Sequence, residues 1–284
     1  MRGRINYYVL AVILLLTLIY VYLNSLEPDI PEQLDFSELI FMLAYSSATV
    51  FAFIVAKRYR GSKVFGRAYL SLAVAYMMNT IGVILFTVLQ IMGTANPFPD
   101  MPDFFFSLYY PLAIIHLMLN IRFVKGGLWL QKGQRLTLVL LPGGVVTIYI
   151  IGMLAPISVD IEQLNQQPHD NIINLIPFVS HIKINEPMSH DADFYRGFYA
   201  GIWYVIATTS VFSWAIIGAQ IFRNTKIGAP WGLLLVGIGL NAVGDVSYYL
   251  TGIYTFDRTT PIICIWVLGL MIISYALHLH RKQI

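Results

Sequence analysis

Charged residues are scarce in this chain of 284 residues, where Asp, Glu, Lys and Arg together make up 12% and hydrophobic residues make up 57%. The mean hydropathy is +0.68. Soluble domains carry about 25% charged residues and could not bury so much apolar surface. The composition therefore excludes an ordinary soluble domain and predicts an integral membrane protein.

Cysteine is nearly absent, since Cys264 stands alone. One cysteine excludes an intramolecular disulfide and a cysteine-based metal cluster. The sequence also lacks a G-x-S-x-G elbow, a P-loop, an H-E-x-x-H pair and any nucleic-acid-binding motif. His169, His181 and His190 fall in one polar segment with several aspartates but match no zinc spacing. We therefore expect no metal site and no nucleic-acid partner.

Long apolar runs are what the sequence has in abundance. Each is near or above the roughly 20 residues that a helix needs to cross a bilayer core, and each is too continuously apolar for a barrel strand. We expect an all-α integral membrane protein, a single domain over residues 1–284, with the lipid bilayer as its surroundings. Its eight expected transmembrane helices cover about 7–24, 38–57, 67–92, 104–124, 135–155, 196–222, 230–252 and 260–280.

Basic and acidic residues fall on opposite sides of these eight runs. All but three of the 18 Lys and Arg residues lie on the side of the N-terminus, the exceptions being Lys183, Arg196 and Arg258. Acidic residues outside the runs lie on the other side, where the sequence has no N-x-Ser/Thr sequon. Because short cytoplasmic loops are enriched in Lys and Arg, we expect both termini to be cytoplasmic, in the plasma membrane of a prokaryote.

An internal repeat is suggested when residues 79–86 are aligned with 241–248. Asn79 and Gly82 then match Asn241 and Gly244, and Phe86 matches Tyr248. The match predicts two parallel four-helix halves, 1–127 and 128–284, unless shared apolar composition alone explains it. Asn79 joins the candidate site as the counterpart of Asn241.

One connection between the runs is much longer than the others. It covers residues 156–194 on the outer side and contains an apolar stretch, INLIPFVSHIKI. A loop of this length either caps the outer face or lies along the membrane interface.

Asp245 is the only one of the 15 acidic residues that falls inside an apolar run. A carboxylate is costly in lipid, so it should face a protein interior or a water-filled cavity and have a partner. Asn241, Asp245 and Tyr248 share one helical face, with Tyr249 beside it. This face predicts an outward-facing pocket in which Asp245 serves as a ligand-binding, proton-carrying or catalytic carboxylate. An interhelical hydrogen-bond anchor is the alternative.

Arg196 and His116 are the expected partners of Asp245, since both fall in apolar runs that can pack beside it. For His116, three interpretations stay open: a haem ligand, a proton carrier or an interior histidine satisfied by hydrogen bonds. A haem would call for a second axial ligand at the same depth, and His278 and His280 lie near the end of the last run. We therefore expect no haem and no other cofactor.

Three segments of the chain resemble the multi-helix sensory regions that precede diguanylate cyclase or histidine kinase outputs in prokaryotic proteins: MPDFFFSLYYPLAIIHL (101–117), NAVGDVSYYLTGIYTF (241–256) and IWVLGLMIISYALHLHR (265–281). The resemblance implies a signal-input membrane module in which Asp245 and Tyr248 belong to the patterned positions. Only Arg281–Ile284 follow the last run. We therefore expect no output domain, and a protein partner in the membrane or the cytoplasm.

A second resemblance is to the eight-helix lysoplasmalogenase-like membrane proteins, through Gly244, Asp245 and the aromatic helix around them. It implies an intramembrane lipid enzyme, and such enzymes are expected to use more than one aspartate. Because Asp245 is the only acidic residue inside an apolar run, the sequence favours a non-enzymatic sensing, binding or complex-subunit module. A lipid-modifying enzyme and a small proton-coupled transporter that uses Asp245 are the alternatives.

Overall fold

The structure is a computed structural model that describes residues 5–26, 36–63, 65–92, 100–127, 129–154, 192–251 and 261–282. Within these ranges the chain forms eight α-helices and no strand. The helices are α1 (Tyr7–Leu26), α2 (Phe36–Arg58), α3 (Phe65–Ile91), α4 (Met101–Lys125), α5 (Lys132–Leu154), α7 (Ala192–Phe222), α8 (Gly228–Thr251) and α9 (Pro261–Lys282).

Seven of these helices, α2 to α5 and α7 to α9, are long and apolar enough to cross a membrane. Helix α1 is also apolar, but its apolar part, Tyr7–Tyr22, is shorter than those of the other seven helices. The prediction of a helical, multi-pass membrane protein is confirmed at this level. The long loop predicted at 156–194 lies mostly outside the described residues.

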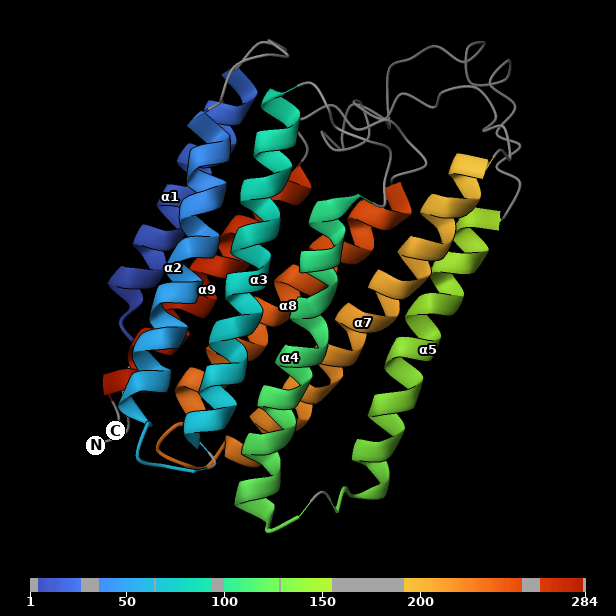
Figure 1. The fold of residues 1–284 in the computed structure, drawn as a ribbon. Helices are drawn as coiled ribbons and strands as arrows, with labels where there is room; N and C mark the ends of the chain where they lie inside the picture. Colours follow the sequence, from blue (N-terminus) through green and yellow to red (C-terminus); the bar gives the residue numbers. More distant parts are fainter. Residues whose placement is uncertain are drawn as a thin grey trace, which may run out of the picture.

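Six helices form a closed circuit of contacts, in two rows of three that face each other (Figure 1). One row is α2, α3 and α4, and the other is α9, α8 and α7; the rows meet where α2 contacts α9 and where α4 contacts α7. Helix α1 lies outside the circuit against α9 and α2, and α5 lies outside it against α7. In the described part of the chain the backbones of the two middle helices, α3 and α8, do not approach each other closely. Large side chains such as Tyr69 of α3 and Trp231 of α8 lie between them.

The described basic side chains gather at one end of the bundle. Helix α1 begins there and α9 ends there, and the connections α2–α3, α4–α5 and α7–α8 lie at the same end (Figure 1). We call it the basic end, and it carries Lys57, Arg58, Arg60, Lys63, Arg67, Arg122, Lys125, Lys132, Arg135, Arg223, Lys226, Arg281 and Lys282. The clustering of basic residues that the sequence predicted is thus present in the described part of the fold.

Helix α4 shows how local sequence sets the helix ends. At its start, the Asp100 carboxylate accepts a hydrogen bond from the backbone N–H of Met101 (2.6 Å), and the Asp103 carboxylate accepts one from the N–H of Asp100 (2.8 Å). Such a capping box satisfies backbone donors that have no partner within the helix. At the other end, Gly126 has a φ of 68°, in the left-handed region that favours glycine.

Hydroxyl side chains join neighbouring helices within the bundle. Ser47 of α2 lies 2.8 Å from the hydroxyl of Ser274 in α9, and Thr49 of α2 lies 2.9 Å from the hydroxyl of Thr80 in α3. Small polar residues of this kind allow close helix packing in membranes and bond across the interface.

Candidate functional site

Asp245 lies in α8, in the half of the helix away from the basic end, and accepts hydrogen bonds from three other helices. The Tyr110 hydroxyl of α4 donates to Oδ2 at 3.1 Å, and the Trp266 indole N–H of α9 donates to Oδ1 at 2.9 Å. Thr208 of α7 also hydrogen-bonds the carboxylate through its side chain. We call Asp245 and these three donors the Asp245 centre.

The donors of the Asp245 centre are all neutral. Within the described residues, no Lys, Arg or His side chain forms an ion pair with the carboxylate. Asp245 nevertheless keeps part of its surface exposed. The centre therefore holds a carboxyl group that is well supplied with hydrogen bonds and has no positive partner among the described side chains.

Aromatic rings surround the Asp245 centre. Tyr204 of α7 stacks on Tyr249 of α8 with ring centroids 4.8 Å apart, and it meets Tyr110 edge to face at 5.7 Å. Tyr248 lies against Trp266 at 5.5 Å. The carboxylate thus lies among tyrosine and tryptophan side chains of α4, α7, α8 and α9.

A second carboxylate lies one tyrosine away and was missed in the sequence. Asp103, two helical turns from Tyr110 along α4, accepts a hydrogen bond from the Tyr204 hydroxyl at 2.9 Å. Two turns correspond to about 11 Å along the helix. The sequence signal was the seven-residue spacing between Asp103 and Tyr110, which places both on one face of α4. Asp103 also caps the first turn of α4, and that role alone accounts for an acidic residue at this position.

The predicted site residues of α8 do not all reach the carboxylate. Tyr248 and Tyr249 belong to the aromatic surroundings, but Asn241 is directed to the crossing with α9, where its side-chain oxygen lies against Gly269. That oxygen is buried and has no hydrogen-bond partner among the described residues. Asn79 is buried in α3 and is not one of the donors that hold Asp245.

The predicted pairing of Asp245 with His116 is wrong. His116 lies in the half of α4 nearer the basic end, and its Nδ1 donates to the backbone carbonyl of Ala68 in α3 at 2.9 Å. Asp245 lies at a different depth, because it is only six residues from the outer end of α8. The side chain of Arg196 falls outside the described residues, so its pairing with Asp245 stays a prediction.

A second polar group, which we call the histidine cluster, contains His116, His280, Tyr59, Tyr69 and Trp231. The Nε2 atom of His280 lies 2.9 Å from the Tyr59 hydroxyl and 2.8 Å from the Tyr69 hydroxyl. The ring of Tyr69 also meets the ring of His116 at 4.8 Å, and Trp231 stacks on His116 at 6.1 Å. All of these side chains lie between the two helix rows, toward the basic end.

His280 lies near the end of α9, as predicted, and still reaches the same tyrosine as His116. Both imidazoles contact the ring of Tyr69, because α4 extends further past the bundle at the basic end than α9 does (Figure 1). Helix stagger of this kind cannot be read from run boundaries. The described residues contain no group of three or more His, Cys, Asp or Glu side chains placed to hold a metal ion.

Two chemical capacities follow from this arrangement. The Asp245 centre can accept a proton or a small cation, since Asp245 is not fully buried and lacks a positive partner among the described residues. The histidine cluster can relay a proton between side chains, because Nε2 of His280 hydrogen-bonds the hydroxyls of both Tyr59 and Tyr69. No protein-family model, no curated protein and no solved structure matches this chain, so these capacities are argued from geometry alone.

Proposed function

We propose that this protein is a non-enzymatic, multi-pass membrane module that binds a positive charge at Asp245. Binding then shifts the packing of the neighbouring helices. One observation carries the proposal. A single carboxylate inside the helix bundle is held by neutral donors from three helices, is partly exposed, and lacks an ion-pair partner among the described residues.

The physical argument rests on the cost of an unpaired charge. A carboxylate removed from water without a compensating cation is strongly disfavoured, and hydrogen bonds from Tyr110, Thr208 and Trp266 recover only part of that cost. The centre is therefore expected to take up a proton or a cation. The tyrosine and tryptophan faces around it suit a small organic ammonium ion.

A sensing role follows from the position of Asp245 in the helix circuit. Its donors belong to α4, α7 and α9, so neutralising the carboxylate weakens contacts that hold four helices together. A ligand shifts a conformational equilibrium by its difference in affinity for the two states. We propose that a partner chain at the basic end reads this shift, as the resemblance to sensory membrane regions implies.

The test uses the indole of Trp266 as a reporter, because it donates directly to Asp245. Purified protein in lipid nanodiscs is titrated with pH, and separately with tetramethylammonium chloride against sodium chloride at equal ionic strength. We expect the emission of Trp266, taken as the difference from Trp266→Phe, to change in at least one titration. Asp245→Asn should abolish that change.

The matched control is Asp100→Asn, because Asn caps a helix as well as Asp does and Asp100 lies at the outer end of α4. It should respond as the wild type does. A wild-type protein whose Trp266 emission responds to neither titration would contradict the proposal, as would an Asp245→Asn protein that keeps the response. Circular dichroism establishes that each variant is folded.

Eight spans with both termini in the cytoplasm of a prokaryotic cell complete the proposal. Helix α1 has 20 residues and begins at the basic end, as an eighth spanning helix would. The gathering of Lys and Arg at this end supports placing it in the cytoplasm.

We further propose that the two halves, 1–127 and 128–284, are parallel repeats. The helix contacts support this proposal. If α2 corresponds to α7 and α4 to α9, the α2–α9 contact has the α7–α4 contact as its counterpart, and both are present. The outer helices α1 and α5 each contact the next helix of their own half, although α1 packs more extensively on α9 and, in the described part of the chain, α5 has no matching contact with α4.

A proton-coupled transporter is the second candidate, favoured by the polar atoms that lie between the Asp245 centre and the basic end. The Tyr76 hydroxyl lies beside that of Tyr109. Nε2 of His116 is buried without a partner among the described residues, and a buried atom of this kind is commonly satisfied by internal water. Proteoliposomes loaded with a pH-sensitive dye test it. Acidification that depends on Asp245 and on an added solute would favour transport, and its absence would leave the binding module.

A further inference from the structure

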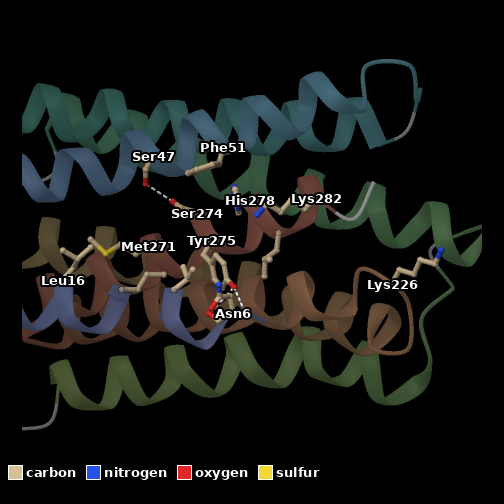
Figure 2. Close-up of a pocket in the computed structure, with 13 residues that line it drawn as sticks. Asn6, Leu16, Ser47, Phe51, Lys226, Met271, Ser274, Tyr275, His278 and Lys282 are labelled. Carbon is tan, nitrogen blue, oxygen red and sulfur yellow. Dashed lines mark hydrogen bonds between the residues drawn. The ribbon is translucent and has the colours of Figure 1, made fainter. Parts of the chain in front are cut away.

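A groove of about 920 Å³ lies on the opposite face of α9 from the Asp245 centre, between α1, α2 and α9 (Figure 2). Its floor includes the hydrogen-bonded pair Ser47 and Ser274. Tyr275 contributes a hydroxyl that accepts a hydrogen bond from the backbone N–H of Asn6 at 2.7 Å. None of the residues that line the groove belongs to the Asp245 centre or to the histidine cluster.

The lining changes character along the groove. Toward the basic end it carries Lys226, His278 and Lys282, and toward the other end it carries Leu16 and Met271 (Figure 2). None of the 13 lining residues is acidic. The groove therefore offers positive charge at one end and apolar surface at the other.

The length of the groove fits one leaflet of a bilayer. Lys282 and Met271 are 11 residues apart on α9, which corresponds to about 16 Å along a helix. The hydrocarbon core of a bilayer is roughly 30 Å thick, so one leaflet provides about half of that. An acyl chain can lie along the apolar part while its headgroup stays at the basic end.

We propose that the groove binds one acidic phospholipid from the leaflet at the basic end. The phosphate lies at the basic end of the groove beside Lys282, with Lys226 further out, and one acyl chain packs along Leu16, Phe51 and Met271 (Figure 2). Basic residues near a membrane surface each contribute about 1 kcal/mol toward binding acidic lipid. A lipid in this place would lie between α1 and the circuit helices α2 and α9, which α1 contacts in the described part of the chain.

The test compares lipids of defined headgroup on protein purified in detergent. Native mass spectrometry and thermal unfolding are measured with phosphatidylglycerol, with phosphatidylcholine of the same chains, and with oleate as a free fatty acid. We expect one phosphatidylglycerol to stay bound and to raise the unfolding temperature. Lys226→Gln with Lys282→Gln should weaken its binding by about 30-fold, from about 1 kcal/mol for each lysine.

The matched control is Lys63→Gln with Lys132→Gln, which removes two exposed lysines of the basic end that do not line the groove. This variant should keep the phosphatidylglycerol effect. Equal effects of phosphatidylcholine and phosphatidylglycerol on the wild type would overturn the proposal. So would an equal loss in both double variants, or binding of oleate in place of the phospholipid. The wild-type comparison decides the matter if a variant does not fold.

Discussion

At the scale of single residues, the hydrogen bonds of His280 set the energetics of the histidine cluster. One imidazole nitrogen serves two tyrosine hydroxyls, and burial raises the pKa of Tyr59 to about 12, so that hydroxyl stays protonated at neutral pH. A buried polar group that loses its partner costs about 1–3 kcal/mol. The order of destabilisation among variants of this cluster is therefore predictable.

We predict that His280→Leu destabilises the protein more than Tyr69→Phe does. His280→Leu leaves the hydroxyls of Tyr59 and Tyr69 without this partner and should lower the free energy of unfolding by about 2–4 kcal/mol. Tyr69→Phe removes one hydroxyl and leaves His280 bonded to Tyr59, for about 1 kcal/mol. Unfolding in detergent under increasing denaturant measures both. The reverse order would show that the cluster is held by packing and not by these bonds.

At the scale of helices, the crossing of α8 and α9 depends on two glycines. A Cβ added at Gly237 would lie 2.8 Å from the carbonyl oxygen of Gly269, and one added at Gly269 would lie 2.9 Å from the carbonyl oxygen of Gly237. Backbone atoms cannot move aside as a flexible side chain can. Small residues at such crossings are what allows membrane helices to approach closely.

We predict that Gly237→Ala and Gly269→Ala each separate α8 from α9 and destabilise the protein by about 1–3 kcal/mol. Gly232→Ala in the same helix is the control, because a Cβ there would meet no atom within 4 Å. It should be neutral or slightly stabilising, since Ala favours helix over Gly. Thermal unfolding of the three variants measures this. Equal destabilisation at Gly232 would locate the effect in the helix backbone and not at the crossing.

At the scale of the whole molecule, the orientation predicted from charge can be tested chemically. A background of Cys264→Ser removes the native thiol, and single cysteines are then placed at Lys63, Lys132 and Met101, all of which are exposed. A membrane-impermeant maleimide should label Met101→Cys on intact cells. It should label Lys63→Cys and Lys132→Cys only after the membrane is opened. Labelling of both ends from one side would contradict a membrane-spanning bundle.

The local sequence pattern predicted the helices well, but it predicted the candidate site less completely. The apolar runs and the loop charges depend on composition alone, so helices were predicted at all eight runs and seven of those found are long and apolar enough to cross a membrane. The basic end could be predicted for the same reason. Asp245 stood out for the same reason, as an acidic residue in an apolar run. The donors Tyr110, Thr208 and Trp266 carried no comparable signal, since hydroxyls and aromatic rings are common in membrane helices.

The sequence by itself determined that the chain is helical and membrane-embedded, because the hydrophobic effect and backbone hydrogen bonding act on each segment separately. Only the tertiary structure decided which side chains meet. It placed three donors around Asp245, turned Asn241 toward Gly269, and brought His280 and His116 to the same tyrosine, Tyr69. Those outcomes depend on the stagger and rotation of the helices and on which helices contact one another. These are set by packing between segments far apart in the chain.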